Sequence, residues 1–484
     1  IIGGGFTGLS AAYALVKQGH QVTVFEKEKT LGGLAHGFKN KGWNWHLESA
    51  YHHLFTNDTA IIHLINELGL SSKLILTRPV TANYVPSFVI PAYAGIQSKM
   101  KTLDSRFHGN DIINSKPGFD SPEGAHTIPF DSPIHLLTYP GLSWLDKLRT
   151  GALVALMKLN TFWRPLESIT AKKLFTAIGG STSWRLLWEP LMIGKFGTYS
   201  DSICASWLWA RIKKRTQKLY YIEGGFHTLV MALEKAIKHH SGIIFTSTAV
   251  NSINKATSGK YQVVWDKQKK EFDRLLLTTP TAIASQLLLN NPSLATNYQL
   301  LTTYFTALRA IPHLHAQTLI LETKKPILAP QPQKVSPFKA KVQNTGVYWL
   351  NIMDRNFPFL AVVAHTNMVD KKYYGGHHLT YFGNYLAPGH PYLSMSKHQL
   401  LKVFIPYIRR LNPSFLTSSV IRHTSFLAPF AQPVHELHYS RRAPKLETPI
   451  PGIYLANMDS IYPWDRGTNY AVELGLKAAK ALLD

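Results

Sequence analysis

Ile1-Ile2-Gly3-Gly4-Gly5-Phe6-Thr7-Gly8 opens the chain and forms a G-x-G-x-x-G turn directly after two apolar residues. Gly3 permits a tight turn, Gly5 lets the backbone approach a pyrophosphate, and Gly8 lets a helix pack closely against a strand. Only two residues remain of the strand that should precede such a turn, and there is no initiator Met. We therefore expect a fragment that lacks a few N-terminal residues.

The following residues extend this turn into a strand–helix–strand unit. Residues 9–16 predict a helix whose N-terminus offers free N–H groups and a positive dipole end to phosphates. Residues 21–25 predict the second strand, and Glu26 at its end is placed to accept hydrogen bonds from both hydroxyls of a ribose. An ordinary glycine-rich turn would not need this order of strand, helix, strand and acid. The sequence therefore predicts a dinucleotide-binding βαβ unit.

A second glycine pair, Gly32-Gly33, follows six residues after Glu26. With this spacing the sequence resembles the flavin amine oxidase superfamily, which includes monoamine oxidases, protoporphyrinogen oxidases, carotenoid desaturases and, more distantly, UDP-galactopyranose mutases. The resemblance implies that the pair packs against the diphosphate of FAD. Nicotinamide enzymes do not usually carry such a pair, so the implied cofactor is FAD.

Two later segments carry the same resemblance. Residues 221–229, YIEGGFHTL, are similar to the superfamily's GG-aromatic-x-x-L entry into a second nucleotide-binding segment, and residues 454–475 are similar to the strand, turn and helix that close over the isoalloxazine. In relatives, the residue matching Val250 holds the adenine through its backbone. The cofactor-binding residues implied by the resemblance are Gly3, Gly5, Phe6, Thr7, Gly8, Glu26, Lys27, Gly32, Gly33, Leu34, Val250, Asn457, Trp464, Gly467, Thr468 and Asn469.

These matches imply an α/β fold with a Rossmann-like FAD-binding domain, discontinuous in sequence, and a mixed α+β substrate domain. We expect the FAD-binding domain to comprise residues 1–80, 220–290 and 445–484, and the substrate domain to comprise residues 126–219 and 291–444. The first substrate-domain piece should be mainly helical, with Ser143 as a helix N-cap, because its apolar residues recur at three- and four-residue spacing. The second should be mixed, because it contains strand-like runs. A Pro- and Lys-containing stretch from Gln331 to Gln343 predicts a loop.

Residues 86–125 do not fit this plan. Codons for residues 89–97 and 103–111 can be written as an inverted repeat at seven of nine aligned positions. We therefore expect an in-frame insertion of a palindromic element that forms an excursion from the fold. Without it, residues 81–85 would run almost directly into residues 126–130 as a hairpin.

Composition limits the classes of partner. The chain has 484 residues, a formal net charge of +24 and a single cysteine, Cys204, so an intrachain disulfide is impossible and a reducing compartment is expected. Cys204 also lies far along the chain from the C-terminal motif, where some relatives attach FAD through a cysteine, so we expect non-covalent FAD. The charge favours an anionic membrane surface or an anionic substrate, and nothing resembles a nucleic-acid-binding module.

The apolar runs are too short for a transmembrane helix, so a cytoplasmic protein is expected, with peripheral association at the inner face of the membrane as an option. The densest basic cluster, residues 211–215, is interpreted as a solvated helix face.

The C-terminal motif supplies the first candidates for chemistry. A helix beginning near residues 467–469 is expected to aim its positive end at flavin N1 and C2=O. Trp464, Tyr462 and Tyr470 are either an aromatic wall at the flavin or ordinary core. Asp465-Arg466 is either a substrate clamp or, preferably, a structural ion pair.

The segment from Trp43 to Phe55 matches the part of the chain that runs beneath the flavin in relatives. The weak catalytic candidates are His52 and Glu48, as acid or base at neutral pH, and Tyr470. A buried structural histidine is the competing interpretation of each histidine. No metal site is expected, because the histidines here lack the spacing of a standard site and no cysteine assists.

The resemblance implies an FAD-dependent oxidoreductase that oxidises a C–H bond of a small organic substrate (an amine, a tetrapyrrole or a polyene) by hydride transfer to flavin N5. Oxygen or a quinone would accept the electrons. A flavin-dependent sugar-nucleotide mutase, an isomerase, is the alternative, although the arginine pair that binds the diphosphate in mutases cannot be located in the sequence. An inactive flavoprotein remnant is a further alternative.

Overall fold

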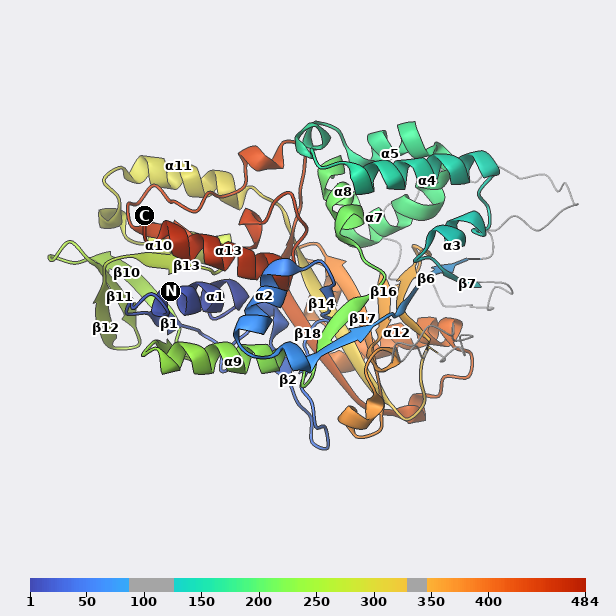
Figure 1. The fold of residues 1–484 in the computed structure, drawn as a ribbon, viewed down its shortest axis with the longest axis horizontal. Helices are drawn as coiled ribbons and strands as arrows, with labels where there is room; N and C mark the ends of the chain where they lie inside the picture. The colour runs from blue at the N-terminus through green and yellow to red at the C-terminus, as the bar shows by residue number, and fades with distance from the viewer. Residues whose placement is uncertain (87–125, 329–345) are drawn as a thin grey trace, which may run out of the picture.

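The computed structural model describes residues 1–86, 126–328 and 346–484 (Figure 1). The expected excursion at 86–125 lies outside the described residues except for Pro86, as does the loop expected from Gln331 to Gln343.

Short parallel strands from distant parts of the chain surround the N-terminal residues. Ile2 forms parallel bridges to Phe25 on one side and to Leu277 on the other, so it links two strand pairs. Those pairs are β1 (Thr23–Phe25) with β9 (Ile243–Phe245), and β13 (Leu275–Leu277) with β19 (Ile453–Leu455). The glycine turn therefore leaves the middle of a parallel arrangement.

Helices cover these strands. Helix α1 (Phe6–Val16) packs against both α9 (Phe226–His239) and α13 (Thr468–Ala481) (Figure 1). The contact with α13 is close because Gly475 has no side chain: a Cβ there would collide with the carbonyl oxygen of Thr7. A three-stranded antiparallel sheet and two helices adjoin this part of the chain: β10 (Val250–Lys255), β11 (Tyr261–Trp265), β12 (Gln268–Phe272), α10 (Thr281–Leu289) and α11 (Tyr298–Arg309).

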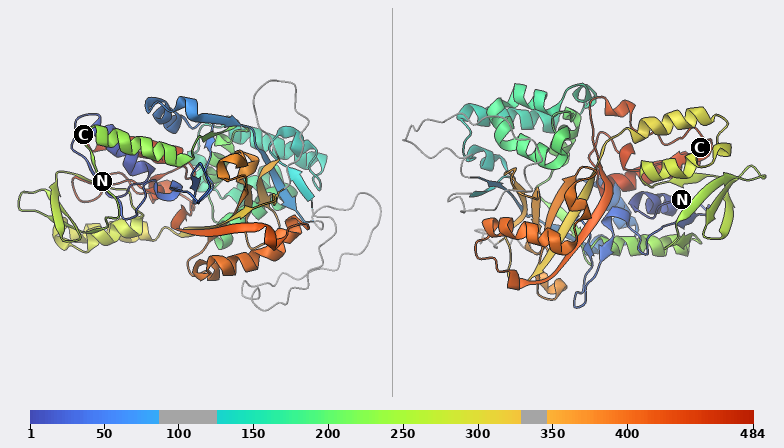
Figure 2. Two further views of the ribbon diagram at one scale, coloured as in Figure 1. Left: turned by 90° about the horizontal axis from the view of Figure 1, so that it is seen from below. Right: turned by 180° about the vertical axis from the view of Figure 1, so that it is seen from behind.

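A mixed seven-stranded sheet is the largest in the structure (Figure 2). Its strands follow the order β18 (Val420–Pro433), β14 (His313–Thr323), β17 (His378–Leu386), β16 (Ala361–Ala364), β15 (Val347–Ile352), β6 (Val80–Val85) and β7 (His126–Pro129). All neighbours are antiparallel except β15 and β6. The hairpin predicted to join residues 81–85 to 126–130 is confirmed, because Val85 pairs with His126.

The segment between β7 and β8 is mainly helical, as predicted. Its helices are α3 (Pro133–Leu137), α4 (Trp144–Leu159), α5 (Ala171–Gly179), α6 (Ser181–Ser183), α7 (Glu189–Phe196) and α8 (Ala205–Lys214). Ser143 caps α4 through a capping box with Asp146, so that prediction is also confirmed.

The remaining elements connect these parts. They are β2 (Gly37–Phe38), β3 (Leu47–Glu48), β4 (Leu54–Phe55), α2 (Thr59–Glu67), β5 (Leu74–Thr77), β8 (Leu219–Ile222) and α12 (Lys397–Leu411). The protein thus has a mixed α/β fold built around a large mixed sheet. Within the described ranges, no helix combines the length and the apolar character needed to cross a membrane.

Candidate functional site

The glycine turn at residues 3–8 and the Gly32-Gly33 pair are in direct backbone contact. Gly5 bridges Gly32, and the Gly32 N–H donates to the carbonyl of Gly4 at 2.9 Å. A Cβ on Gly33, whose φ is +57°, would lie 3.1 Å from the Cα of Gly5. A Cβ on Gly8 would collide with the carbonyl oxygen of Gly3. Side chains are therefore excluded where the turn, the helix and the glycine pair come together.

Glu26 lies beside this turn with its carboxylate buried. Its Oε2 accepts from the Gly4 N–H at 2.7 Å, and its Oε1 accepts from the Glu28 N–H at 2.9 Å. A carboxylate bound to backbone amides has a fixed position, although it retains lone pairs for further donors.

The start of α1 is open to an anion. Gly5 is its N-cap, no side chain caps it, and its first turn carries no acidic residue. The first N–H groups of a helix have no partners within the helix, so this terminus favours negative charge. The glycine backbone, the uncapped helix and Glu26 fit the diphosphate and ribose of a dinucleotide cofactor.

Helix α13 begins in the same open way. Gly467 precedes it without a side-chain cap, and its first turn contains no acidic residue. The Oδ1 of Asn469 accepts from the Ile61 N–H at 3.1 Å, so this side chain anchors α2. The helix therefore begins with backbone N–H groups that no side chain caps, while the Asn469 oxygen is already used within the fold.

Two of the three predicted aromatic residues stack together. Trp464 stacks on Tyr470 at a centroid distance of 5.7 Å and on Trp209 at 5.3 Å, and the Lys214 ammonium lies 4.8 Å from the Trp464 ring centroid. Tyr462 lies apart from this stack. Its hydroxyl is 2.7 Å from that of Ser206, so it belongs to a different cluster.

Asp465 holds a buried charge cluster together. Its carboxylate accepts from Arg211 at 2.7 Å, from the Trp207 indole at 3.0 Å and from Lys195 at 3.4 Å. Burial alone would raise the pKa of Asp465, but Lys195 and Arg211 hold it well below its usual range. Burial lowers the pKa of Lys195 well below its usual range. The Arg211 side chain is 42% exposed, so it lies on a solvated face, as interpreted, and at the same time binds Asp465.

The expected ion pair between Asp465 and Arg466 does not form. The Nε of Arg466 instead donates to the Gln432 side chain at 3.0 Å, and its guanidinium lies 4.8 Å from the Tyr385 ring centroid. Arg215 donates to the hydroxyl of Thr81 at 3.0 Å. Burial lowers the pKa of Arg466 to about 10. Neither forms an ion pair with any residue that the structure describes.

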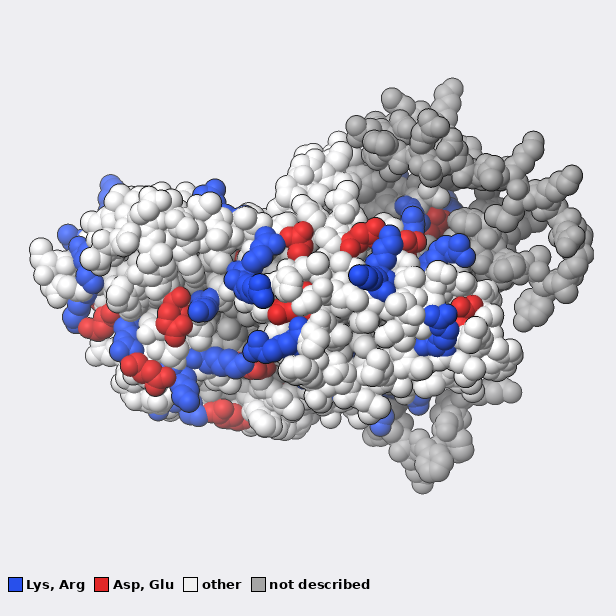
Figure 3. All heavy atoms as spheres, turned by 90° about the horizontal axis from the view of Figure 1, so that it is seen from above, with Lys and Arg blue, Asp and Glu red and all other residues white. Residues whose placement is uncertain are grey.

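Lysines and arginines elsewhere are spread over the molecule. On the face seen in Figure 3 they alternate with acidic side chains rather than forming one patch. Arg466 differs from these surface cations because it is half-buried and has no counter-charge among the described residues.

Glu48, a predicted catalytic candidate, is enclosed by protein. Its carboxylate accepts from the Phe226 N–H at 2.7 Å and from the Tyr221 hydroxyl at 2.9 Å, and burial raises its pKa to about 7. Gly225 passes so close that a Cβ there would lie 2.8 Å from the Glu48 Oε1. Glu48 thus ties β3 to the start of α9, which is a structural contact.

His52 and His53 are neutral in the folded protein. Burial lowers the pKa of His52 to about 4 and that of His53 to about 3. The Nδ1 of His52 is 2.7 Å from the carbonyl of Ala50, so its Nε2 is left as an acceptor. His53 lies 3.2 Å from the hydroxyl of Tyr348. At neutral pH His52 is therefore uncharged, and its Nε2 can accept a hydrogen bond but binds a proton only weakly. Burial also raises the pKa of Tyr470.

Cys204 is distant from the C-terminal motif in sequence but close to it in the structure, so the prediction that it lies far from that motif is wrong. Its Sγ lies 2.9 Å from the Ser206 hydroxyl and 3.9 Å from that of Tyr462. The thiol is buried, and burial raises its pKa. A thiol in this state is a poor nucleophile.

The remaining predicted cofactor residues do not form one cluster with the glycine turn. Lys27 and Leu34 are exposed, and Val250 begins β10. The Asn457 amide donates to the carbonyl of Thr279 at 3.1 Å, and its oxygen caps the turn that follows, so its side chain is committed to the fold.

Sequence reasoning did not identify the partners of Asp465. Lys195 and Trp207 lie more than 250 positions away in the chain, and neither belongs to a motif. The only sequence feature that pointed to a partner of Asp465 was the basic run that contains Arg211.

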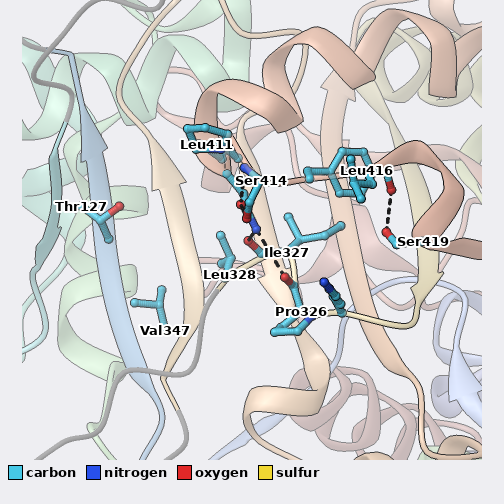
Figure 4. Close-up of a pocket in the computed structure, with 13 residues that line it drawn as sticks. Thr127, Pro326, Ile327, Leu328, Val347, Leu411, Ser414, Leu416 and Ser419 are labelled. Carbon is cyan, nitrogen blue, oxygen red and sulfur yellow. Dashed lines mark hydrogen bonds between the residues drawn. The ribbon is translucent and has the colours of Figure 1, made fainter.

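A hollow of about 450 Å³ lies elsewhere, between the end of α12 and the seven-stranded sheet (Figure 4). It is largely apolar and includes Ile327, Leu328 and Leu411. None of the predicted site residues lines it, so we do not assign the chemistry to it.

The glycine contact and the uncapped helices are typical of a protein that binds a nucleotide cofactor. The chain belongs to the family of flavin-containing amine oxidoreductases, whose family model matches residues 6–483. The family implies a flavin cofactor.

Named relatives are distant. The chain is 25% identical over 313 residues to coproporphyrinogen III oxidase of Staphylococcus aureus, covering 58% of this chain and 60% of that protein. It is 25% identical over 201 residues to zeta-carotene desaturase of Capsicum annuum, covering 40% of this chain and 30% of that protein. The chain thus spans less than two thirds of either relative.

The solved structure of a reduced UDP-galactopyranose mutase matches with a TM-score of 0.69 and 13% identity, covering 100% of this chain and 93% of the mutase. At this identity the likeness shows the fold alone.

Proposed function

We propose that the protein is an FAD-dependent oxidoreductase that binds FAD without a covalent bond in a Rossmann-like domain and oxidises a C–H bond of an organic substrate. The observation that carries the proposal is the contact between Gly5 and Gly33 beside the uncapped start of α1. There the backbone N–H groups of Phe6, Thr7 and Gly8 would face the diphosphate, and Glu26 would accept from the ribose.

When bound, FAD would supply a hydride acceptor at N5. The open N-terminus of α13 would stabilise negative charge at flavin N1 and C2=O, because Gly467 and Thr468 place backbone N–H groups there. Trp464 and Tyr470 would pack against the ring system. The Nε2 of His52 is available to accept a hydrogen bond from the substrate.

The substrate class is inferred from the charge of Arg466. This half-buried arginine lacks a carboxylate partner among the described residues, so a substrate with an anionic group would compensate it. A tetrapyrrole with carboxylates satisfies this need better than an uncharged polyene or an amine. We propose oxygen or a quinone as the electron acceptor, and a cytoplasmic site with peripheral membrane contact.

Anaerobic mixing of the FAD-loaded protein with a reduced tetrapyrrole, a carotenoid precursor and an amine tests this function. Bleaching of the visible flavin band by one substrate, followed by recovery when air or quinone is added, is the expected result. Failure of every substrate class to bleach a fully loaded protein would contradict an oxidoreductase.

A sugar-nucleotide mutase is the second candidate, favoured by the same unpaired arginine, Arg466. It would catalyse an isomerisation with no net redox change. Dithionite-reduced protein incubated with UDP-galactopyranose distinguishes the two, because only the mutase forms a ring-contracted product. A protein that remains colourless after incubation with FAD would instead indicate an inactive remnant.

A further inference from the structure

Helix α4 has two apolar faces, only one of which is covered by protein. Thr150, Leu153 and Met157 are buried and pack against the neighbouring helices. At 100° per residue, Leu148 and Leu159 point to the opposite side of the helix. An ordinary surface helix would carry polar residues on that side.

The uncovered face extends along the whole helix and past its end. We call it the α4 ridge, and its large apolar side chains are each 48 to 80% exposed: Trp144, Leu145, Leu148, Leu156, Leu159 and Phe162. Ala152 and Ala155 are exposed between the leucines, so no charged residue interrupts the stripe. Contiguous exposed apolar surface of this kind marks an interaction site.

Unpaired cations flank the α4 ridge. Lys147 and Lys158 lie on the same side of the helix, and Arg164 and Lys213 lie near its C-terminal end. Not one of the four forms an ion pair within residues 1–86, 126–328 and 346–484. The acid in the first turn of α4, Asp146, is used in the capping box with Ser143.

We propose that the α4 ridge docks the protein on a membrane surface that contains anionic lipid. Leucines along a helix, aromatic residues at its ends and lysines at its sides are the pattern of a helix that lies in the membrane interface. The net charge of +24 adds long-range attraction to anionic headgroups. A second copy fits less well, because a symmetric pair of ridges would bring the same cations together.

The α4 ridge lies next to helix α8, so docking on a membrane would place the lipid surface close to that helix. The Nζ of Lys158 donates to the carbonyl of Arg215 at 2.6 Å, so the end of α4 contacts the end of α8. Helix α8 also carries Arg211, which binds Asp465. In Figure 1 these helices lie at the opposite end of the molecule from β10, β11 and β12. Docking would therefore bring the lipid surface beside Arg211 and Arg215, where a lipid-soluble substrate would enter.

Vesicle co-sedimentation of the full chain tests the proposal. We expect it to bind vesicles of phosphatidylcholine with phosphatidylglycerol and to bind phosphatidylcholine alone much more weakly. A variant with L145S, L148S, L156S and L159S should lose affinity at least about tenfold. The matched control carries L300S, L416S, L427S and L476S, which change leucines that are also exposed, and should bind as the wild type does.

Both variants should keep the wild-type melting temperature and flavin content, because all eight leucines are exposed. Equal loss of binding in the two variants, or no binding of the wild type to anionic vesicles, would overturn the proposal. So would a wild-type dimer that only the ridge variant dissociates, because the occupant would then be a second copy. These results do not depend on flavin chemistry, so the docking and the proposed function can fail separately.

Discussion

Gly5 and Gly33 face each other without side chains, so that a Cβ on Gly33 would lie 3.1 Å from the Cα of Gly5. Both residues come from loops next to the uncapped start of α1. The contact leaves no room for a side chain on Gly33 beside the position where a diphosphate would bind. This relationship is the physical basis for the proposed cofactor site.

Gly33→Val should weaken FAD binding at least about tenfold, because the side chain would enter the space between the two loops. The control is Gly19→Val, since Gly19 also has a positive φ but has no atom within 4 Å of a built Cβ. Titration of the apoprotein with FAD, followed by flavin fluorescence, gives both dissociation constants. Equal losses in the two variants would show that backbone strain, and not the contact, is responsible.

Glu26→Gln should raise the FAD dissociation constant by roughly 10- to 100-fold, which corresponds to the loss of a charge-assisted hydrogen bond to the ribose. The amide oxygen of Gln can still accept from the Gly4 N–H, so the fold should persist. Glu28→Gln removes a carboxylate that is 66% exposed and should have no effect. If both variants bind FAD like the wild type, Glu26 does not contact the ribose.

Asp465→Asn should destabilise the protein by about 3–5 kcal/mol, because Lys195 would remain buried without its counter-charge. Chemical denaturation followed by circular dichroism measures this loss. Asp201→Asn is the control: it breaks the exposed pair with Lys172 and should cost less than about 1 kcal/mol. A similar small loss in both variants would mean that Asp465 does not compensate a buried charge.

Glu48→Gln should become more stable relative to the wild type as the pH rises from about 4.5 to 7. Burial raises the pKa of Glu48 from 4.5 to about 7. The folded protein therefore binds the Glu48 proton more tightly than the unfolded chain, and this contribution is lost as the pH rises through that range. The difference in free energy of unfolding should change by roughly 3 kcal/mol at most.

The comparison variant is Glu223→Gln, which changes an exposed carboxylate close in sequence to Tyr221. Its stability difference from the wild type should not follow this pH trend. A flat difference curve for Glu48→Gln would contradict a raised pKa and would reopen a catalytic role for a charged Glu48.

Local patterns allowed much of the fold to be predicted. The turn at Gly3 and Gly8, the cap at Ser143 and the hairpin between residues 81–85 and 126–130 depend on neighbours close in sequence, or on a pairing that the spacing implies. The physical rule is the same in each case: a backbone that must turn, start a helix or pair locally restricts which residues can occupy it.

The charged interior could not be predicted in the same way. Asp465 is paired with Lys195 and Arg211, and Cys204 contacts Tyr462, across 254 to 270 positions of sequence. Such contacts are set by how α7 and α8 pack against the C-terminal segment, which no local periodicity encodes. For this reason, the adjacency of Asp465 and Arg466 in the sequence suggested an ion pair that does not form. Their side chains bind different partners.

The central claim is that the chain holds FAD without a covalent bond. Purified protein should be incubated with FAD, freed of excess cofactor and then denatured, and the released and retained flavin should be separated by chromatography. The account predicts one equivalent of intact FAD in the released fraction and none on the polypeptide. A protein that takes up no FAD would contradict the cofactor site, and flavin that stays on the denatured chain would contradict non-covalent binding.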